Sequence, residues 1–385
     1  MPSLQPLMTM AGFAGLAAAC AYAVLTAMSV LAWRLQRNPH RSSWRPPVTL
    51  LKPLCGAEPG LSEHLRTFCK QAYPEFQIVF GVRDHADPAC AVVRRLAADF
   101  PSIEIELVVD PRLHGSNLKI SNLINMLPSA RHDVLVMADS DAFVDDHYLD
   151  AVTAPLEDDA VGLVTCLYRG IPTGNLCSRL GAMYINEWYV PSVLLAWLFG
   201  HQGYVSGQSV GMRRDSLAAA GGLPAMADHL ADDHRLGELV RAAGFKIVLS
   251  RYVVKGEHHE PNFSSLIRHE LRWMRTIKVL KPRSFRMLFV TFSLPLTAAA
   301  FAAASRSSHS VVAWTLLALT LTARLVLHVV HVSGDGRPAA RDLWLLPFRD
   351  PLIFWVWCRT FFTSRVTWRG VEFAVGADGV MHPLS

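Results

Sequence analysis

The N-terminal part of the chain lacks charge altogether: from Met1 to Trp33 there is no charged residue. Over the 385 residues, charged side chains make up only 18% and hydrophobic ones 51%, with a mean hydropathy of +0.24. A chain this apolar is not an ordinary soluble domain. Residues 8–33 exceed the roughly 20 apolar residues that a membrane-spanning helix needs. The sequence therefore predicts an N-terminal membrane anchor over residues 1–35.

A cleaved signal peptide is the alternative for this segment. It would need Lys or Arg before a shorter apolar run, whereas here the positive charges follow the run, at Arg34, Arg37, Arg41 and Arg45. By the positive-inside rule, the segment after the helix then lies in the cytosol. We expect an integral membrane protein whose main domain is on the cytosolic face.

The cysteines lack any CxxC spacing and are odd in number, which argues against both a disulfide framework and a zinc site. The seven are Cys20, Cys55, Cys69, Cys90, Cys166, Cys177 and Cys358. The net charge of +5 is mild and no nucleic-acid motif is present. Since Lys and Arg gather near the apolar segments, we expect the lipid bilayer as a partner and no nucleic acid.

Short apolar runs alternate with amphipathic stretches between Trp44 and Arg251, which predicts an α/β domain with a mainly parallel sheet. The candidate strands are residues 48–51, 76–82, 103–109, 134–138, 161–168 and 245–249. Four of them run directly into charged residues, at Lys52, Arg83-Asp84, Asp110 and Asp139. Ligands of open α/β sheets bind at the carboxyl ends of strands, so we expect the chemistry at this rim.

The composition changes again after Pro282. Residues 287–304 and 311–332 are apolar and predict a membrane hairpin. Residues 343–362 are interrupted by prolines and charges, which favours a re-entrant or interfacial helix. We therefore predict a catalytic domain over residues 44–285, with an amphipathic helix at its end, and a C-terminal membrane region over residues 286–385.

Asp139 and Asp141 form a DxD tripeptide directly after the run 134–138. Two such carboxylates can bind Mg²⁺ or Mn²⁺, and the cation then bridges diphosphate oxygens. A solvated turn after a strand explains the tripeptide alone equally simply.

A second acidic pair, Asp232-Asp233, opens a segment whose apolar residues share one helical face. Helix capping is the simple interpretation of Asp232. Asp233 is a candidate general base that takes a proton from an attacking hydroxyl.

His269, Arg272 and Trp273 fall at i, i+3 and i+4 of an amphipathic stretch, so a helix presents all three together. Such a face can pair a cation with a phosphate while the indole packs against a ring. The alternative is a basic helix on lipid headgroups, because further Lys and Arg residues cluster here.

In order and spacing, Asp84, Asp139, Asp233 and the xxxRW run resemble the D, D, D, (Q/R)xxRW signature of processive and lipid-directed inverting glycosyltransferases. Residues 48–282 look most like the ceramide glucosyltransferase family, through 51–54 (LKPL), 82–85 (VRDH), 117–123 (NLKISNL) and Gly221-Gly222. Within it, residues 114–125, 164–169 and 269–276 resemble the bacterial hopanoid-biosynthesis branch. The resemblance implies a GT-A-type fold, a UDP-sugar donor, a hopanoid polyol or ceramide acceptor, and the bacterial inner membrane.

The resemblance also implies roles for individual residues. Asp84 is assigned to the uridine, Asp139 and Asp141 to the metal and diphosphate, Asp233 to the base, and Arg272 with Trp273 to the donor diphosphate and the acceptor. His269 departs from the signature, which has Gln or Arg at that position. Asp141 is present here although ceramide enzymes can lack it, which favours metal dependence. One base and one leaving-group clamp imply inversion, and the branch implies N-acetylglucosamine as the sugar.

Several residues keep two interpretations. Lys52 and Lys119 are donor-binding candidates, although Lys119 also fits a solvated helix face. His258 and His259 fit an ordinary loop or a metal ligand. Trp188 and its aromatic neighbours fit a lipid entrance or interfacial anchoring. The competing functions are a processive polysaccharide synthase, which normally needs more spanning helices, and a non-catalytic nucleotide-sugar-binding membrane module.

Overall fold

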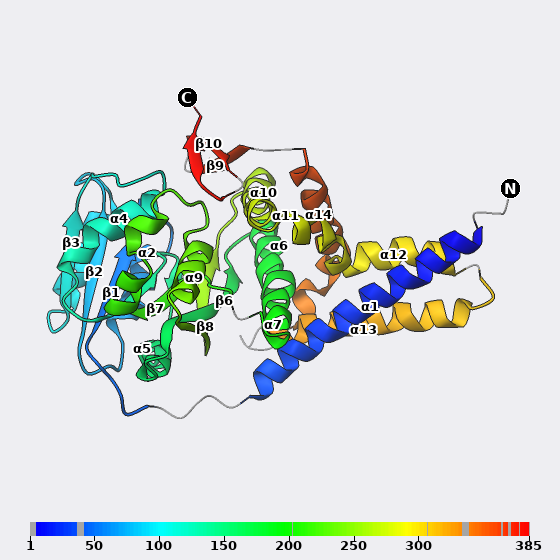
Figure 1. The fold of residues 1–385 in the computed structure, drawn as a ribbon, viewed down its shortest axis with the longest axis horizontal. Helices are drawn as coiled ribbons and strands as arrows, with labels where there is room; N and C mark the ends of the chain where they lie inside the picture. Colours follow the sequence, from blue (N-terminus) through cyan, green and yellow to red (C-terminus); the bar gives the residue numbers. More distant parts are fainter. Residues whose placement is uncertain are drawn as a thin grey trace. The chain divides into compact units, whose positions relative to one another are not determined.

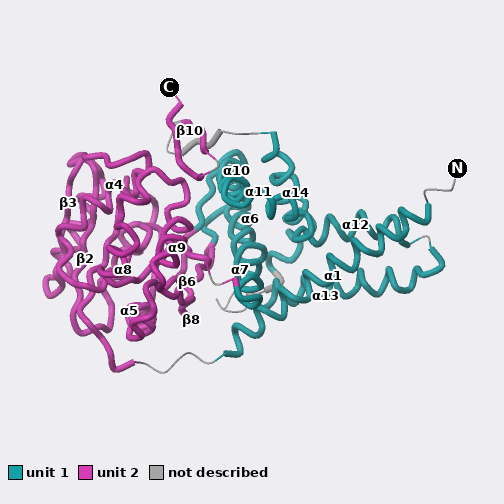
Figure 2. The backbone as a smooth tube through the Cα atoms, viewed as in Figure 1, with its two compact units in different colours: residues 1–37, 172–200, 258–367 teal, residues 38–171, 201–257, 368–385 magenta. Residues whose placement is uncertain are grey.

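The computed structural model describes residues 5–36, 42–201, 203–305, 307–332, 339–362, 365–368, 371–376 and 378–384. They fall into two compact units (Figure 2). The sheet unit comprises residues 38–171, 201–257 and 368–385, and the helical unit comprises 1–37, 172–200 and 258–367. These limits differ from the domain limits predicted at 44–285 and 286–385. Arg37 and Arg41, on which the positive-inside argument partly depends, lie outside the described residues.

The sheet unit is built on one eight-stranded sheet of order β3-β2-β1-β4-β7-β6-β8-β5 (Figure 1). Its strands are β1 (Val48–Pro53), β2 (Phe76–Val82), β3 (Glu104–Val109), β4 (Val134–Ala138), β5 (Ala142–Phe143), β6 (Val161–Pro172), β7 (Ser209–Arg213) and β8 (Lys246–His258). Strands β2 and β4 have the predicted limits, while β6 and β8 run further than the sequence indicated.

The four strands β3-β2-β1-β4 pair in parallel. Strands β1, β2 and β4 are almost entirely buried and rich in Val, Leu and Ile, as expected of parallel strands covered on both faces. Strand β7 lies antiparallel between β4 and β6, and β5 pairs antiparallel with β8. The predicted fold class, a Rossmann-like mainly parallel sheet flanked by helices, is confirmed.

The helices of the sheet unit cover a core that includes Leu50, Ile78, Val136 and Tyr148. They are α2 (Leu61–Cys69), α3 (Ala89–Asp99), α4 (Leu118–Met126), α5 (Tyr148–Thr153), α8 (Arg214–Ala219) and α9 (Asp232–Ala242), with 3₁₀ turns at Leu127–Ser129, Ala154–Glu157 and Leu223–Met226. Helix α4 starts where the Asn117 side chain accepts hydrogen bonds from the N–H groups of Lys119 and Ile120. This cap fixes Lys119 in the first turn.

The helical unit contains the long apolar segments. It consists of α1 (Gln5–Leu35), α6 (Leu176–Tyr184), the π-helix Ile185–Tyr189, α7 (Val190–Leu198), α10 (Phe263–Leu280), α11 (Pro282–Met287), the 3₁₀ turn Leu288–Thr291, α12 (Ser293–Ala304), α13 (Ser310–Val332), the 3₁₀ turn Ala339–Leu345 and α14 (Leu346–Thr360). Helices α1, α12 and α13 run side by side (Figure 1). A Cβ on Gly12 of α1 would lie 2.8 Å from the Ala300 carbonyl oxygen of α12. Small residues thus let these helices approach closely.

Among the described residues, two helices are long and apolar enough to cross a membrane, α1 and α13. A third span is formed only if Pro282–Thr291 and α12, which are bent by 65° at their junction, count as one. The first arm of the predicted hairpin is therefore broken rather than straight. Helix α14 carries Pro351 in its interior and is not among the candidate spans, in line with the non-spanning interpretation of residues 343–362.

A short three-stranded sheet near the C-terminus was not predicted. It contains β9 (Arg365–Trp368), β10 (Val371–Val375) and β11 (Met381–Pro383), with β10 and β11 antiparallel. The chain just before β11 pairs with the loop that leads to α9: Leu230 N–H donates to the Gly379 carbonyl at 3.0 Å, and Met381 N–H to the Asp228 carbonyl at 2.8 Å. The end of the chain thus supports the loop before Asp232.

Candidate active site

The DxD residues lie at the carboxyl end of β4, as the sequence predicted. Asp139 follows the strand directly, and its N–H donates to the Gln208 carbonyl at 3.2 Å. The Asp139 carbonyl in turn accepts from the Ala142 N–H at 3.3 Å, which closes a turn between β4 and β5. This turn carries Asp139 and Asp141 on one short, fixed segment at the rim of the sheet.

Lys119 joins three segments of this rim. Its Nζ lies 2.6 Å from Asp139 Oδ1 and 3.8 Å from Asp232 Oδ2, and it donates to the Gly207 carbonyl at 3.2 Å. Burial alone would lower the pKa of Lys119, but the Asp139 and Asp232 carboxylates outweigh it and raise the pKa above its ordinary value. Lys119 is therefore a fixed cation within the acidic cluster, and the solvated-face interpretation is wrong.

Lys52 lies behind the rim. Its side chain is completely buried, its Nζ donates to the Asp139 carbonyl at 2.8 Å, and it sits 3.4 Å from the centroid of the Phe68 ring. Burial lowers the pKa of Lys52 to about 7. The amine holds the main chain of Asp139 in place, a positioning contact that the sequence did not indicate.

Asp141 faces Gln208, whose Nε2 donates to Asp141 Oδ1 at 2.9 Å. Burial, with the nearby carboxylates of Asp139 and Glu58, raises the pKa of Asp141 to about 7. Like-charged carboxylates that disfavour each other's ionised form are stabilised by a cation between them. Their oxygens are the ligands that Mg²⁺ and Mn²⁺ prefer, so this pair fits a divalent cation.

Asp233 lies in the first turn of α9. The residue preceding the helix is Ala231, so the prediction that Asp232 caps it is wrong. Asp233 Oδ2 accepts a hydrogen bond from the Gly207 N–H at 3.0 Å, and Oδ1 accepts from the His234 N–H at 2.7 Å. Burial, followed by the charge of Asp232, raises the pKa of Asp233 to about 6. An oriented carboxylate with a raised pKa is suited to accept a proton.

Asp84 lies at the carboxyl end of β2, one strand away from β4 along the same parallel edge. Its carboxylate is exposed and accepts from the Ala86 N–H at 2.9 Å. Within the described part of the chain it has no hydrogen bond or ion pair with the Asp139–Lys119–Asp232–Asp233 cluster. The structure thus brings Asp139, Lys119 and Asp233 together around Gly207 and leaves Asp84 apart from them.

The xxxRW residues lie on α10 in the helical unit. The rings of His269 and Trp273 are 4.2 Å apart, which fits their predicted i and i+4 positions on one helical face. Trp273 also lies 5.0 Å from the Tyr184 ring of α6. Arg272, between them in the sequence, is half-buried.

Glu260, which the sequence did not single out, anchors His269. It is almost completely buried, and its Oε1 lies 2.8 Å from His269 Nδ1 and 3.5 Å from His258 Nε2. Burial and the neighbouring His269 lower the pKa of His258 to about 4. One ligand atom from each of the three residues lies within 4.8 Å of the others, close enough to share one cation. His258 is thus a buried side chain and not part of an exposed loop.

A buried ion pair holds α10 against α14, and removing one of its partners is expected to destabilise the protein. Arg349 donates to both carboxylate oxygens of Glu270 at 2.8 and 2.9 Å, and both residues are buried. An uncompensated buried charge costs about 3–5 kcal/mol, so Glu270→Gln should lower the thermal unfolding midpoint of the detergent-purified protein. The double variant Glu270→Leu/Arg349→Met should restore it. A midpoint unchanged by Glu270→Gln would contradict the role of this pair.

The sheet and the acidic rim at its strand ends define a GT-A-like nucleotide-sugar-type fold. The chain belongs to glycosyl transferase family 21, whose family model matches residues 12–381. It is 25% identical over 263 residues to ceramide glucosyltransferase 3 of Caenorhabditis elegans, covering 66% of this chain and 56% of that protein. It is also 25% identical over 254 residues to ceramide glucosyltransferase 1 of the same organism, covering 65% and 54%.

The chain therefore spans about half the length of the curated relatives it matches. Among solved structures, it resembles the mannosyltransferase PcManGT from Pyrobaculum calidifontis in complex with GDP-Man and Mn²⁺. The TM-score is 0.57 at 19% identity, over 92% of this chain and 99% of that one. This likeness shows the fold.

Proposed function

We propose that the protein is an inverting, metal-dependent glycosyltransferase that transfers a sugar from a UDP-sugar to the hydroxyl of a membrane lipid. The observation that carries this proposal is the convergence of Asp139, Lys119 and Asp233 around Gly207. It combines a cation-binding carboxylate, a fixed positive charge and a carboxylate of raised pKa within one rim. Membership of glycosyl transferase family 21 supports the class of reaction.

Asp233 is the general base in this mechanism. Its Oδ2 is held by the Gly207 N–H and accepts the proton of the acceptor hydroxyl as that oxygen attacks the anomeric carbon. Lys119 and Arg272 supply positive charge for the departing UDP. One base on one side and the leaving group on the other make a single displacement, so an α-linked donor gives a β-linked product.

Asp139 and Asp141 would hold Mg²⁺ or Mn²⁺, which, when bound, stabilises negative charge on the diphosphate. Lys52 keeps Asp139 in position from behind, and Gln208 orients Asp141. The printed description of PcManGT with Mn²⁺ and a nucleotide sugar supports a divalent cation in this fold. We assign Asp84 to the uridine side, and His269 with Trp273 to the donor and acceptor.

The sugar and the lipid are the finer part of the proposal. Residues 114–125, 164–169 and 269–276, which resemble the hopanoid branch, favour N-acetylglucosamine and a hopanoid polyol. The matched relatives favour the alternative, ceramide with UDP-glucose. In either case we place the catalytic residues on the cytosolic face of a membrane, which in a bacterium is the inner membrane.

Labelling of extracted lipid tests the proposal. Membranes containing the protein are incubated with Mn²⁺, labelled UDP-N-acetylglucosamine or UDP-glucose, and either bacteriohopanetetrol or ceramide. We expect label in one glycolipid, with mass spectrometry identifying the product. If both donors leave both lipids unlabelled, the transferase proposal fails and the non-catalytic membrane module becomes the better account.

The pH dependence of transfer should report Asp233. A base must be deprotonated to accept a proton, and the pKa of Asp233 is raised to about 6 by burial and by Asp232. We therefore expect kcat/KM to fall as the pH drops through about 6, by about tenfold per pH unit below it. Initial rates across the pH range, at fixed Mn²⁺, measure this. A profile that stays flat down to the ordinary aspartate pKa of 3.8 would contradict the assignment.

A further inference from the structure

A π-helical turn interrupts the helix that runs from α6 to α7 in the helical unit. It covers Ile185–Tyr189, and it places Glu187 in the interior, where only 4% of that residue is exposed. Such turns are rare within helices and are frequent at functional sites. Glu187 is therefore a candidate functional group that the transfer mechanism does not use.

Glu187 belongs to a buried network with charged residues of α13 and α14. Its Oε1 lies 2.8 Å from His328 Nδ1, and its main-chain carbonyl accepts a hydrogen bond from Arg324 at 3.3 Å. Arg324 donates to both carboxylate oxygens of Asp350, at 2.7 and 3.1 Å. Arg324 and His328 lie on a helix apolar enough to cross a membrane. Ionisable residues in such a helix are costly and mark binding sites or ion paths.

One oxygen of this network has no hydrogen-bond partner. Glu187 Oε2 is fully buried, and the nearest charge, Arg324 Nη2, is 3.6 Å away. It lines a pocket with about 10 Å³ of room for the centre of a water-sized group, together with Tyr22 and Thr26 of α1, Trp188, Arg324 and Asp350. That volume suits a single small polar group.

The charges of the pocket decide which group fits. Arg324 disfavours a bound cation, and Glu187 with Asp350 disfavours an anion. A neutral hydrogen-bond donor, such as a hydroxyl or an amide N–H, satisfies Glu187 Oε2 without adding charge. The occupant is therefore a neutral polar group.

A line of aromatic rings connects this pocket with the xxxRW helix inside the same unit. Trp273 lies 5.0 Å from Tyr184, and Tyr184 lies 5.0 Å from Trp188, which lines the pocket. Trp188 stacks on Phe292 at 6.0 Å. A molecule with both polar and apolar parts can lie along such rings, because they offer apolar faces and the Trp188 Nε1 is already bonded to Thr291.

We propose that this pocket binds a second polar group of the lipid acceptor, a hydroxyl or amide beside the hydroxyl that receives the sugar. Glu187 Oε2 accepts its hydrogen bond, and Thr26 forms part of the wall. The inference rests on the proposed lipid glycosyltransferase function and adds a chemical requirement to it: the acceptor carries at least two neighbouring polar groups.

The test compares acceptors with and without the second group, on the full chain in detergent. The pair is C8-ceramide and its 3-deoxy analogue or, if the labelling assay identifies a hopanoid, bacteriohopanetetrol and a hopanoid mono-alcohol. For the wild type we expect the KM of the mono-alcohol to be at least tenfold higher. In Thr26→Met, which fills the pocket, and in Glu187→Gln, which removes the acceptor oxygen, the two KM values should converge.

Thr320→Met is the matched control. Thr26 and Thr320 are both buried threonines whose hydroxyls bond to carbonyls of their own helices, but Thr320 does not line the pocket. The control should retain the wild-type preference for the two-group acceptor. If Thr26→Met and Glu187→Gln also retain it, or slow both acceptors equally, the pocket serves packing only and the inference is overturned.

Direct binding separates this inference from the proposed function. If the wild type transfers sugar to neither lipid, the function fails, and equilibrium binding of radiolabelled C8-ceramide and bacteriohopanetetrol to the purified protein still tests the pocket. We expect Thr26→Met to weaken binding of the bound lipid at least tenfold and Thr320→Met to leave it unchanged. Equal binding by the wild type and Thr26→Met, or binding of neither lipid, would overturn the inference.

Discussion

Asp233→Asn should reduce sugar transfer by about 10²–10⁴-fold in kcat, the usual contribution of a positioned general base. The amide is nearly the same shape and keeps an oxygen that can accept from the Gly207 N–H, but it cannot take a proton from the acceptor hydroxyl. UDP-sugar binding should stay near the wild-type level, because Asp233 acts on the acceptor. Single-turnover rates and isothermal titration with the UDP-sugar measure the two effects separately.

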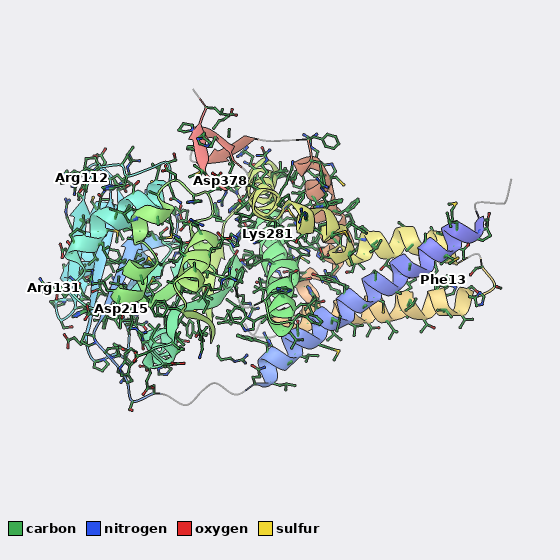
Figure 3. The ribbon with its side chains drawn as sticks, in the orientation of Figure 1. Phe13, Arg112, Arg131, Asp215, Lys281 and Asp378 are labelled. Carbon is green, nitrogen blue, oxygen red and sulfur yellow. The ribbon has the colours of Figure 1, made fainter. Side chains whose placement is uncertain are left out.

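Asp215→Asn is the control for this change. Asp215 (Figure 3) is the second residue of α8, as Asp233 is the second residue of α9, and each carboxylate accepts a hydrogen bond from the next N–H in the chain. Asp215 is largely exposed and belongs to no part of the rim cluster. Its variant should transfer sugar at the wild-type rate. Full turnover by Asp233→Asn would remove the base assignment.

Asp141→Asn should have the second largest effect, together with removal of the divalent cation. Electrostatic stabilisation by a bound metal contributes several kcal/mol, so transfer should fall by about 10²–10³-fold. In wild type, EDTA should have the same effect and added Mn²⁺ should reverse it. In Asp141→Asn, a higher Mn²⁺ concentration should be needed for half-maximal rate, which a titration of initial rate against Mn²⁺ measures.

Asp146→Asn provides the comparison, since Asp146 follows shortly after the DxD but is more than half exposed. Its Mn²⁺ requirement should match the wild type. Undiminished transfer in the presence of EDTA would contradict the metal assignment. It would leave Lys119, already 2.6 Å from Asp139, to neutralise the carboxylates alone.

The sequence predicts the rim well where strands are long and buried. Apolar runs at 76–82 and 134–138 give the limits of β2 and β4 because such runs have no other stable place than the interior of a sheet. The parallel pairing then brings the residues after these strands to one edge. Asp84, Asp139 and Asp141 could therefore be placed at that edge before any coordinates were known.

Residues supplied by irregular or distant segments could not be predicted. Gly207 and Gln208 precede β7, a five-residue strand inserted antiparallel between β4 and β6, and short strands give little periodic signal. Glu260 follows two histidines and a strand, and its contact with His269 depends on tertiary packing. The pairing of Met381 with Asp228 joins segments more than a hundred residues apart, which no local pattern reveals.

The interleaving of the two units constrains how the protein is made. The chain passes from one unit to the other at 37/38, 171/172, 200/201, 257/258 and 367/368. Strand β7, in the middle of the sheet, is thus synthesised after the helical excursion 172–200. Insertion of apolar helices and completion of the sheet must proceed in alternation, which makes assembly slow because the pairings are distant in sequence. A soluble fragment cut from residues 44–285 would carry helices stripped of their neighbours and should aggregate.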